Sequence, residues 1–296
     1  MRTPRRVAVV AHQRKTLGGG LDELRRRLTD QGIDKLHWYE VSKSRKAPKK
    51  LARALAKKPD VLIVWGGDGM VQRAVDAVAR AGRNVPLAVM PAGTGNLLAG
   101  NLGIPADLPA ALELAFHGRR RTIDVGRING EHFAVMAGVG FDGAMIRDAD
   151  RKLKDRLGKL AYVWAGLRHV NGAKPTARVR IDGTSWFDDE ASCVLVGNVG
   201  TITGGITAFD DAKPDDGWLD VGVATAQGAA QWARALGTMA VGRAEQSPFV
   251  RVTRARRIDV RLRSKLTYEL DGGARTATRK LSIRVAPGAL RVCVPR

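Results

Sequence analysis

The chain has 296 residues and a formal net charge of +21, from 50 lysines and arginines against 29 acidic residues. This length allows one large domain or two medium ones with a substantial core. The only two cysteines, Cys193 and Cys293, lie far apart in sequence, which excludes a disulfide framework and a cysteine-rich metal site. No secretory or membrane-spanning stretch is present, so we expect a cytoplasmic protein.

The positive charge is concentrated in two segments. Residues 251–296 are strongly basic, and residues 43–58 combine eight basic side chains with no acidic one: Lys43, Arg45, Lys46, Lys49, Lys50, Arg53, Lys57 and Lys58. Such charge favours an acidic partner, namely an anionic membrane surface, a phosphorylated ligand or nucleic acid. Aromatic residues are only 5% of the chain and do not interleave with the basic segments, so we expect no nucleic acid. Solvated basic faces without a partner remain the alternative.

Strand and helix patterns alternate up to about residue 122. Apolar runs predict strands at residues 7–11, 33–41, 61–65 and 85–90, and the helical periodicity falls between them, at 21–28, 49–58 and 71–79. This alternation predicts a doubly wound parallel sheet, in which ligands bind at the carboxyl ends of the strands.

Two glycine-rich turns lie where ligands would bind in such a sheet. Gly66-Gly67-Asp68-Gly69 follows the run 61–65, and Pro91-Ala92-Gly93-Thr94-Gly95-Asn96 follows the run 85–90. Glycine lets the main chain approach a phosphate closely, and the amides of a following helix attract its charge. Asp68 could hold Mg²⁺ or accept a proton, or it could simply cap the helix that starts at Met70. Thr94 and Asn96 could contact phosphate or merely form a turn and a helix cap.

The pattern changes near residue 123 and becomes mainly β. Asn129-Gly130 predicts a hairpin, and a helical stretch is predicted from about residue 141 to 167. Short strands are predicted at 177–181, 192–196, 219–224, 257–262, 266–270 and 281–285, with a helix at about 229–241. The expected domains are therefore residues 1–122, which bind nucleotide, and residues 123–285, which are β-rich and bind substrate. Residues 286–296 are a further candidate part of the first domain.

The motifs, taken together, resemble the diacylglycerol kinase catalytic domain family, which includes sphingosine and ceramide kinases. Residues 66–70 (GGDGM) resemble its GGDGT signature, and residues 91–105 (PAGTGNLLAGNLGIP) resemble its P-x-GTxNDFAR-x-LGIP segment. Residues 138–142 (GVGFD), residues 215–220 (DDGWLD) and Asp271-Gly272 are similar to later motifs of the family. The likeness spans most of the chain in the same order, and the bacterial soluble lipid kinases of the family are the most similar in size.

The resemblance implies a fold, a reaction and a set of site residues. It implies an N-terminal doubly wound parallel sheet of the NAD-kinase and diacylglycerol-kinase type, followed by a C-terminal antiparallel β-rich domain. The reaction would be transfer of the γ-phosphate of ATP to a hydroxyl of diacylglycerol or a related lipid, at an anionic membrane surface to which the enzyme binds peripherally. A homodimer is also considered. The residues implied to bind ATP are Gly66, Gly67, Asp68, Gly69, Met70, Val71, Gln72, Gly93, Thr94, Gly95 and Asn96.

Two further groups of residues follow from the same resemblance. Asp68 would lie near the transferred phosphate, and Asp216 would hold a structural Mg²⁺ with the main-chain carbonyls of Lys213 and Trp218. Gly273 stands where the family has a glutamate that is proposed as the general base.

The departure at Gly273 leaves three interpretations. Asp68 serves as the base, or a nearby carboxylate such as Glu269 or Asp271 replaces the missing one, or the protein binds nucleotide or lipid and transfers phosphate poorly. Met70 also replaces the signature threonine, and a loop at residues 11–20 replaces Asn-Pro-x-Ser-Gly. A kinase of a soluble substrate, of the NAD-kinase type that shares the GGDG turn, is the other alternative.

Overall fold

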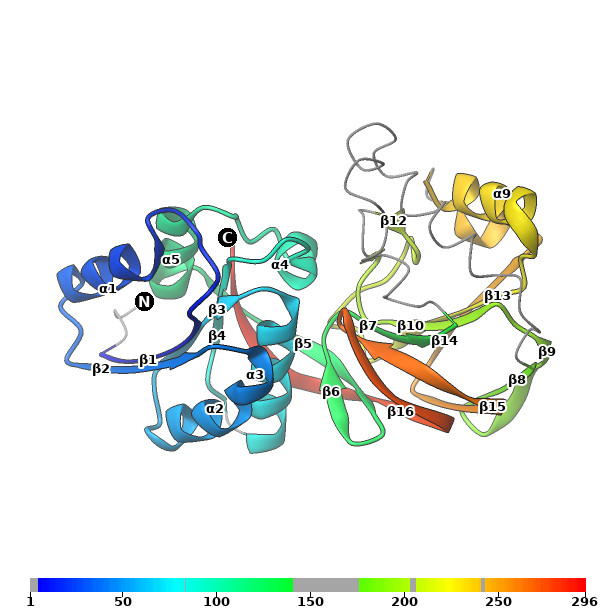
Figure 1. Cartoon of the computed structure of the whole chain (residues 1–296), viewed down its shortest axis with the longest axis horizontal. Helices are drawn as coiled ribbons and strands as arrows, with labels where there is room; N and C mark the ends of the chain where they lie inside the picture. Colours follow the sequence, from blue (N-terminus) through cyan, green and yellow to red (C-terminus); the bar gives the residue numbers. More distant parts are fainter. Residues whose placement is uncertain (1–4, 83, 141–175, 203–205, 241–242) are drawn as a thin grey trace. The chain divides into compact units, whose positions relative to one another are not determined.

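The computed structural model describes residues 5–82, 84–140, 176–202, 206–240 and 243–296. The chain forms two compact units: unit 1 comprises Met1–Val125 with Pro287–Arg296, and unit 2 comprises Gly126–Ala286 (Figure 1). The helical stretch predicted from about residue 141 lies outside the described residues. None of the described helices is long and apolar enough to span a membrane.

Unit 1 is built on a parallel sheet with the strand order β4-β3-β1-β2. Its strands are β1 (Arg6–His12), β2 (Lys35–Val41), β3 (Val61–Gly66) and β4 (Leu87–Pro91). Every residue of β3 and β4 is buried, as expected for central parallel strands covered on both faces. The last part of β16 (Gly273–Val294) joins this sheet, because Val292 pairs with Leu87 in parallel.

Helices cover both faces of this sheet (Figure 1). Alternate strand residues point to opposite faces, and those of one face share an apolar core with α1 (Gly20–Asp30) and α5 (Leu108–His117). On the other face lie α2 (Ala47–Ala56) and α3 (Asp68–Ala81), which pack on each other. The short helices η1 (Ser44–Lys46) and α4 (Leu97–Asn101) complete the unit.

Unit 2 is a mainly antiparallel β structure around its own apolar core. It contains the second part of β5 (Arg119–Ile128) and the first part of β16. Its other elements are β6 (Glu131–Phe133), β7 (Met136–Val139), β8 (Thr176–Ile181), β9 (Thr184–Glu190), β10 (Cys193–Gly197), β11 (Thr201–Ile202), β12 (Ile206–Thr207), β13 (Leu219–Ala224), α9 (Gly228–Ala240), η3 (Ala244–Gln246), β14 (Val250–Ala255) and β15 (Arg257–Leu270).

Three tight turns connect hairpins of unit 2, at Asn129-Gly130, Asp182-Gly183 and Asp271-Gly272. Both residues of each turn have positive φ, which is the geometry of the type I′ turn that Asn-Gly and Asp-Gly sequences favour. The hairpin expected at Asn129-Gly130 is thereby confirmed, with Ile128 paired to Glu131.

The sequence prediction of the fold class is confirmed, but several strands of unit 2 differ, and β7, β11, β12 and β14 were not predicted. Residues 257–262 and 266–270, predicted as separate strands, form the single strand β15, whose register shifts between Arg261 and Tyr268. The intervening residues include neither glycine nor proline, so the chain forms an irregularity within one strand and does not turn. Strand β9 was not predicted, because only Phe187 is buried in its polar and acidic sequence.

Candidate active site

The two glycine turns lie side by side at the carboxyl ends of neighbouring strands. Gly66 of β3 pairs with Pro91 of β4, and the Ala92 N–H donates to the Gly66 carbonyl at 3.0 Å. The main chains then approach so closely that a Cβ added at Gly93 would lie 2.3 Å from the Gly67 Cα. Glycine is required here because any side chain would force the two turns apart.

The Asp68 carboxylate connects the two turns. It belongs to the first residue of α3, and its two oxygens accept hydrogen bonds from the N–H groups of Asn96 at 3.0 Å and Leu97 at 2.6 Å. Asp68 therefore caps α4 across a separation of 28 residues. The alternative interpretation, that it caps its own helix, is wrong: the N-cap of α3 is Gly67, and no side chain caps that helix.

Asn96 shapes the second turn from within. Its φ is +49°, a left-handed conformation that asparagine tolerates better than most residues. Its Oδ1 accepts from the Gly93 N–H at 2.9 Å, and its Nδ2 donates to the carbonyls of Pro91 at 3.0 Å and Gly93 at 2.9 Å. The side-chain amide of Asn96 is thus hydrogen-bonded within its own turn. A contact of this segment with a ligand would therefore be made by the surrounding main chain.

The tips of both turns leave N–H groups available to a ligand. Thr94 and Gly95 are exposed, and within the described residues their N–H groups donate to no protein acceptor. The N–H groups of Asp68 and Gly69 are in the first turn of α3, where a helix has no acceptor of its own to offer. A cluster of such donors at strand ends is suited to bind phosphate oxygens.

The other predicted ATP-binding residues contribute main chain and packing. Met70, Val71 and Gln72 of α3 are buried, so their side chains are not exposed to a ligand that binds from solvent. A Cβ at Gly66 would lie 2.7 Å from Met70, which shows that Met70 packs against the first turn. Where the family carries a threonine, this chain has an apolar side chain that supports the turn.

Two residues beside the first turn were not among the predicted site residues. His12 ends β1 at the same sheet edge, and its Nδ1 accepts from the Arg14 N–H at 3.2 Å. Partial burial, and then the charge of Lys15, lower the pKa of His12, which favours a neutral ring. Ser44 of η1 has its hydroxyl 3.4 Å from the position that a Cβ of Gly69 would take. The position of His12 at a strand end is a signal that could have identified it, whereas Ser44 is brought in by tertiary packing.

In unit 2, Asp271 holds a segment of main chain. Its carboxylate is buried and accepts from the N–H groups of Ala134 at 2.9 Å, Val135 at 3.0 Å and Met136 at 2.9 Å. The next residues form the turn from β15 into β16. Asp271 was predicted as a catalytic carboxylate, and these contacts give it a positioning role for the segment that leads into β7.

Gly273 lies directly after this turn and next to a guanidinium group. Arg275 donates to the Gly273 carbonyl at 2.9 Å and pairs with Glu131 at 3.0 Å. A Cβ added at Gly273 would lie 2.9 Å from the end of the Arg275 side chain. A larger residue at 273 therefore has to displace the end of the Arg275 side chain, which Glu131 also holds. Glu269, the other nearby carboxylate considered, is buried in β15.

The residues predicted to hold a structural Mg²⁺ are arranged around Asp216. One oxygen of this carboxylate accepts from the Trp218 N–H at 3.1 Å, and the other is paired with the Arg254 guanidinium. Carboxylate and carbonyl oxygens are suitable donors for Mg²⁺, but here Arg254 already supplies the positive charge. In this arrangement a guanidinium occupies one of the Asp216 oxygens that would be offered to the ion, and the site with the carbonyls of Lys213 and Trp218 stays a prediction. Among the described residues, no group of three histidine, cysteine or acidic side chains could hold a metal.

Asp220 is a second carboxylate near Arg254, and it is 5% exposed. Burial raises its pKa to about 6, and the charges of Asp211 and Glu245 add to the effect. Arg254 lies 3.7 Å from Asp220 and closer to Asp216, so its charge compensates the buried carboxylate only in part.

We expect Gly93→Ala to destabilise unit 1 by about 1–3 kcal/mol and to weaken ATP binding, because the added methyl group overlaps Gly67. Gly100→Ala is the matched control, since nothing lies within 4 Å of a Cβ at this position of α4. Thermal unfolding and ATP titration of both variants measure the effect. Equal behaviour of the two variants would contradict the close approach of the turns.

We expect Asp220→Asn to stabilise the protein by about 1–3 kcal/mol above pH 6. Because the folded pKa is raised to about 6 from the ordinary value of 3.8, folding opposes ionisation of this group, and stability falls as the pH rises between these values. The gain from asparagine should therefore decline below pH 6 and vanish below about pH 4. Denaturant unfolding of both proteins across this range tests the prediction, and a gain independent of pH would contradict it.

Comparison with known proteins agrees with this arrangement. The diacylglycerol kinase catalytic domain matches residues 11–128, and the YegS C-terminal NAD kinase beta sandwich-like domain matches residues 134–294. The chain is 31% identical over 253 residues to a protein of Mycobacterium tuberculosis named diacylglycerol kinase, covering 83% of this chain and 80% of that protein. It is 35% identical over 245 residues to a Pseudomonas aeruginosa protein named "Probable lipid kinase YegS-like", covering 82% and 79%.

A solved structure supports the fold. The crystal structure of a diacylglycerol kinase from Bacillus anthracis superposes with a TM-score of 0.78 at 24% identity, over 99% of this chain and 98% of that one. The resemblance seen in the motifs is confirmed by the matches of both domains and by the relatives. The chain therefore belongs to the diacylglycerol kinase family of phosphotransferases, with a diacylglycerol kinase catalytic domain followed by a YegS C-terminal domain.

Proposed function

We propose that this protein is an ATP-dependent lipid kinase that transfers the γ-phosphate of ATP to a hydroxyl of diacylglycerol or a related membrane lipid. The observation that carries the proposal is the pair of turns joined by Asp68, with its N–H groups open to a ligand. A chain of this family with such a cradle at its strand ends is suited to hold the phosphates of a nucleotide.

The main chain of Gly66–Gln72 and of Gly93–Asn96 binds ATP in this proposal, with the Thr94 hydroxyl as the exposed side-chain donor. Mg²⁺ accompanies the nucleotide and neutralises charge on its phosphate oxygens. Asp68 is an acidic side chain within this cradle. Its two accepted hydrogen bonds fix the carboxylate in place, as preorganised catalysis requires.

Asp68 is also the carboxylate that we propose for proton transfer from the lipid hydroxyl. Asp271 is less suited to this role because it is only 4% exposed, whereas Asp68 is partly exposed. Phosphoryl transfer depends mainly on positioning and charge stabilisation, so a weak base slows the reaction without abolishing it. A second candidate function, binding of lipid or nucleotide with poor transfer, is favoured by one observation, the glycine at position 273.

The lipid and the membrane are the partners in this proposal. Acting on a lipid requires binding to a bilayer surface, and the net charge of +21 favours an anionic one. The enzyme would thus associate with the membrane peripherally.

Incubation with γ-labelled ATP and a total lipid extract tests the function. We expect label in the organic phase, and none on NAD or other soluble hydroxyl acceptors offered in parallel. Label on a soluble acceptor alone would favour a kinase of the NAD-kinase type. ATP binding without any labelled product would favour the binding protein.

We expect Asp68→Ala to reduce kcat by at least about 100-fold, in line with loss of a proton acceptor and of charge positioning. Because this change also releases α4, Asn96→Ala is the control: it disturbs the same turn and keeps the carboxylate. Asn96→Ala should mainly raise the KM for ATP. If the two variants show the same kcat, Asp68 acts only through the shape of the turn.

We expect Gly273→Glu to raise kcat by about tenfold or more, since it restores a carboxylate where the family places its base, and a general base contributes about 10²–10⁴-fold. Gly273→Gln has the same size and cannot accept the proton, so it should leave kcat unchanged. Steady-state assays of both variants with diacylglycerol give the comparison. Equal kcat values for the two variants would show that a carboxylate at position 273 does not take part in the reaction.

A further inference from the structure

One face of the sheet formed by β8, β15 and β16 is covered by cationic side chains. Alternation along the strands sends Val179, Val260 and Leu281 into the core of unit 2 and their neighbours outward. The six outward cations are here called the basic sheet face: Arg178, Arg180, Arg257, Arg261, Lys280 and Arg284, all exposed.

Like charges lie directly opposite one another on this face. Arg261 of β15 is in register with Arg178 of β8 on one side and with Lys280 of β16 on the other. A further pair of like charges, Arg257 and Arg284, is in register nearby. Opposite residues in a sheet have their Cβ atoms about 4.5–5.5 Å apart, and like charges at this distance destabilise the pairing.

Few anions compensate this charge. Asp188 pairs with Arg178 at 2.7 Å, and Asp259 pairs with Arg257 at 2.9 Å. Within the part of the chain that the structure describes, Arg261 and Lys280 form no ion pair. Protection of a sheet edge does not account for Arg261, because β15 lies between β8 and β16 in the sheet. Neither ion pairing nor protection of a sheet edge therefore explains the uncompensated cations Arg261 and Lys280.

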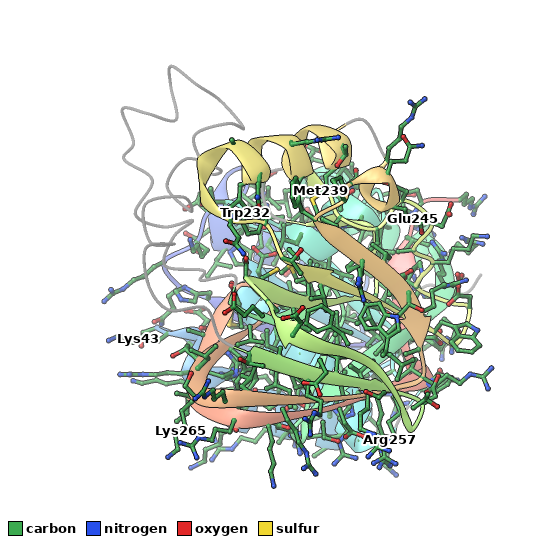
Figure 2. All side chains as sticks on the ribbon, turned by 90° about the vertical axis from the view of Figure 1, so that its right-hand side faces the viewer. Lys43, Trp232, Met239, Glu245, Arg257 and Lys265 are labelled. Atoms are coloured by element: carbon green, nitrogen blue, oxygen red, sulfur yellow. The ribbon has the colours of Figure 1, made fainter. Side chains whose placement is uncertain are left out.

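The cations of this face other than Arg284 line a hollow that could receive a ligand, together with Asp188 and Asp259. Its volume is about 530 Å³, and polar side chains including Asn129, Ser185 and Ser282 complete its lining. Figure 2 looks onto unit 2, where Arg257 and Lys265 lie at opposite ends of the lower side of this sheet. Guanidinium groups offer several donors in a planar fork that matches phosphate oxygens.

We propose that the basic sheet face is a docking surface for an anionic lipid bilayer, with phosphate headgroups seated on the row Arg178, Arg261 and Lys280. This inference rests on the proposed function, which requires access to a membrane lipid. A bilayer is favoured over nucleic acid because the lining of the hollow includes no aromatic side chain on which a base could stack. Each cation near an anionic bilayer adds about fivefold to the affinity.

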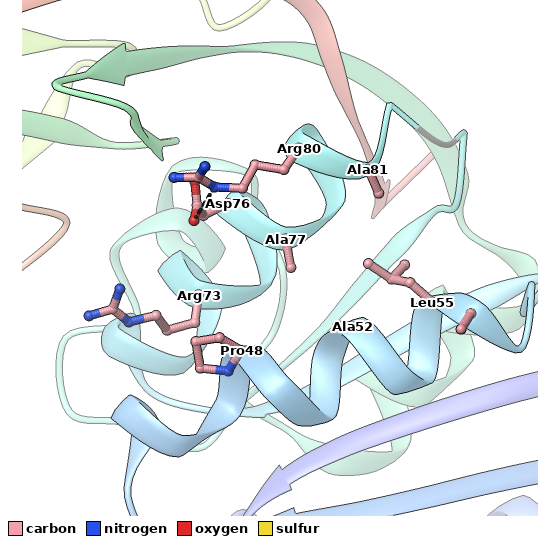
Figure 3. A pocket seen from close by; sticks show the side chains of 9 residues that line it. Pro48, Ala52, Leu55, Arg73, Asp76, Ala77, Arg80 and Ala81 are labelled. Atoms are coloured by element: carbon pink, nitrogen blue, oxygen red, sulfur yellow. Dashed lines mark hydrogen bonds and ion pairs between the residues drawn. The ribbon is translucent and has the colours of Figure 1, made fainter.

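A second basic region provides the comparison. In unit 1 a groove of about 490 Å³ lies between α2 and α3, with an apolar floor that includes Ala52 and Leu55 (Figure 3). Of its two cations, Arg73 and Arg80, the second is paired with Asp76 at 2.8 Å. The lysines of α2 alternate with buried leucine and alanine, as on an ordinary amphipathic helix. No strand register forces these cations together, so this region serves as the control.

The test compares two variants that each lose three charges. Arg178→Gln/Arg261→Gln/Lys280→Gln changes the row, and Lys49→Gln/Lys50→Gln/Arg53→Gln changes α2. Binding is measured by co-sedimentation with vesicles of phosphatidylglycerol and phosphatidylcholine in equal parts, and with phosphatidylcholine alone. We expect the row variant to lose about 100-fold in affinity for the anionic vesicles and the α2 variant to lose much less.

The melting temperature separates docking from folding. Because the row variant removes opposed like charges, it should melt at or above the temperature of the unchanged protein. If the triple variant does not fold, Arg261→Gln/Lys280→Gln keeps the Asp188 pair and should lose about 20-fold. Unchanged binding of the row variant, or an equal loss in both triple variants, overturns the proposal. So does loss of binding to a DNA oligonucleotide with vesicle binding retained.

Kinase assays keep this inference distinct from the proposed function. With a short-chain diacylglycerol dispersed as monomers, the row variant should be as active as the unchanged protein, whereas with vesicles it should be slower. If the unchanged protein phosphorylates neither substrate, the proposed function is wrong. The vesicle-binding measurements still test the docking surface in that case.

Discussion

The candidate site depends on one interaction, the acceptance of two main-chain hydrogen bonds by the Asp68 carboxylate. These bonds hold the start of α4 against the start of α3, and the glycines at 67 and 93 allow the two turns to touch. The N–H groups of both turns can then face one ligand. In the proposed function, the same carboxylate would lie beside the bound phosphates, so that one side chain would both shape the site and accept the proton.

Periodicity predicted most of unit 1, because buried parallel strands and amphipathic helices leave strong local patterns. Both turns were found from their glycine-rich sequences directly after apolar runs. The contact of Asp68 with Asn96 and that of Asp271 with Ala134 could not be predicted, since they join residues 28 and 137 positions apart and no local pattern records them. Irregular strands are equally hidden: the register shifts of β15 leave no turn signal in its sequence.

Unit 2 contains two different arrangements of charged side chains. Around Asp216 and Asp220, a guanidinium from β14 takes the position that a cation could have taken, and the partly compensated Asp220 has a raised pKa. On the basic sheet face, cations are opposed by other cations. In the first arrangement the carboxylates are compensated by a guanidinium of the same unit. In the second, the excess positive charge can attract an anionic partner.

The replacement at Gly273 is best understood from the hairpin around it. Asp271 and Gly272 form the turn, and Asp271 anchors the segment that leads into β7. Gly273 has no part in these contacts apart from its carbonyl, and its φ is not one that demands glycine. Loss of a glutamate there removes a carboxylate without disturbing the scaffold. In the proposed function, the proton acceptor is therefore sought at the phosphate cradle, at Asp68.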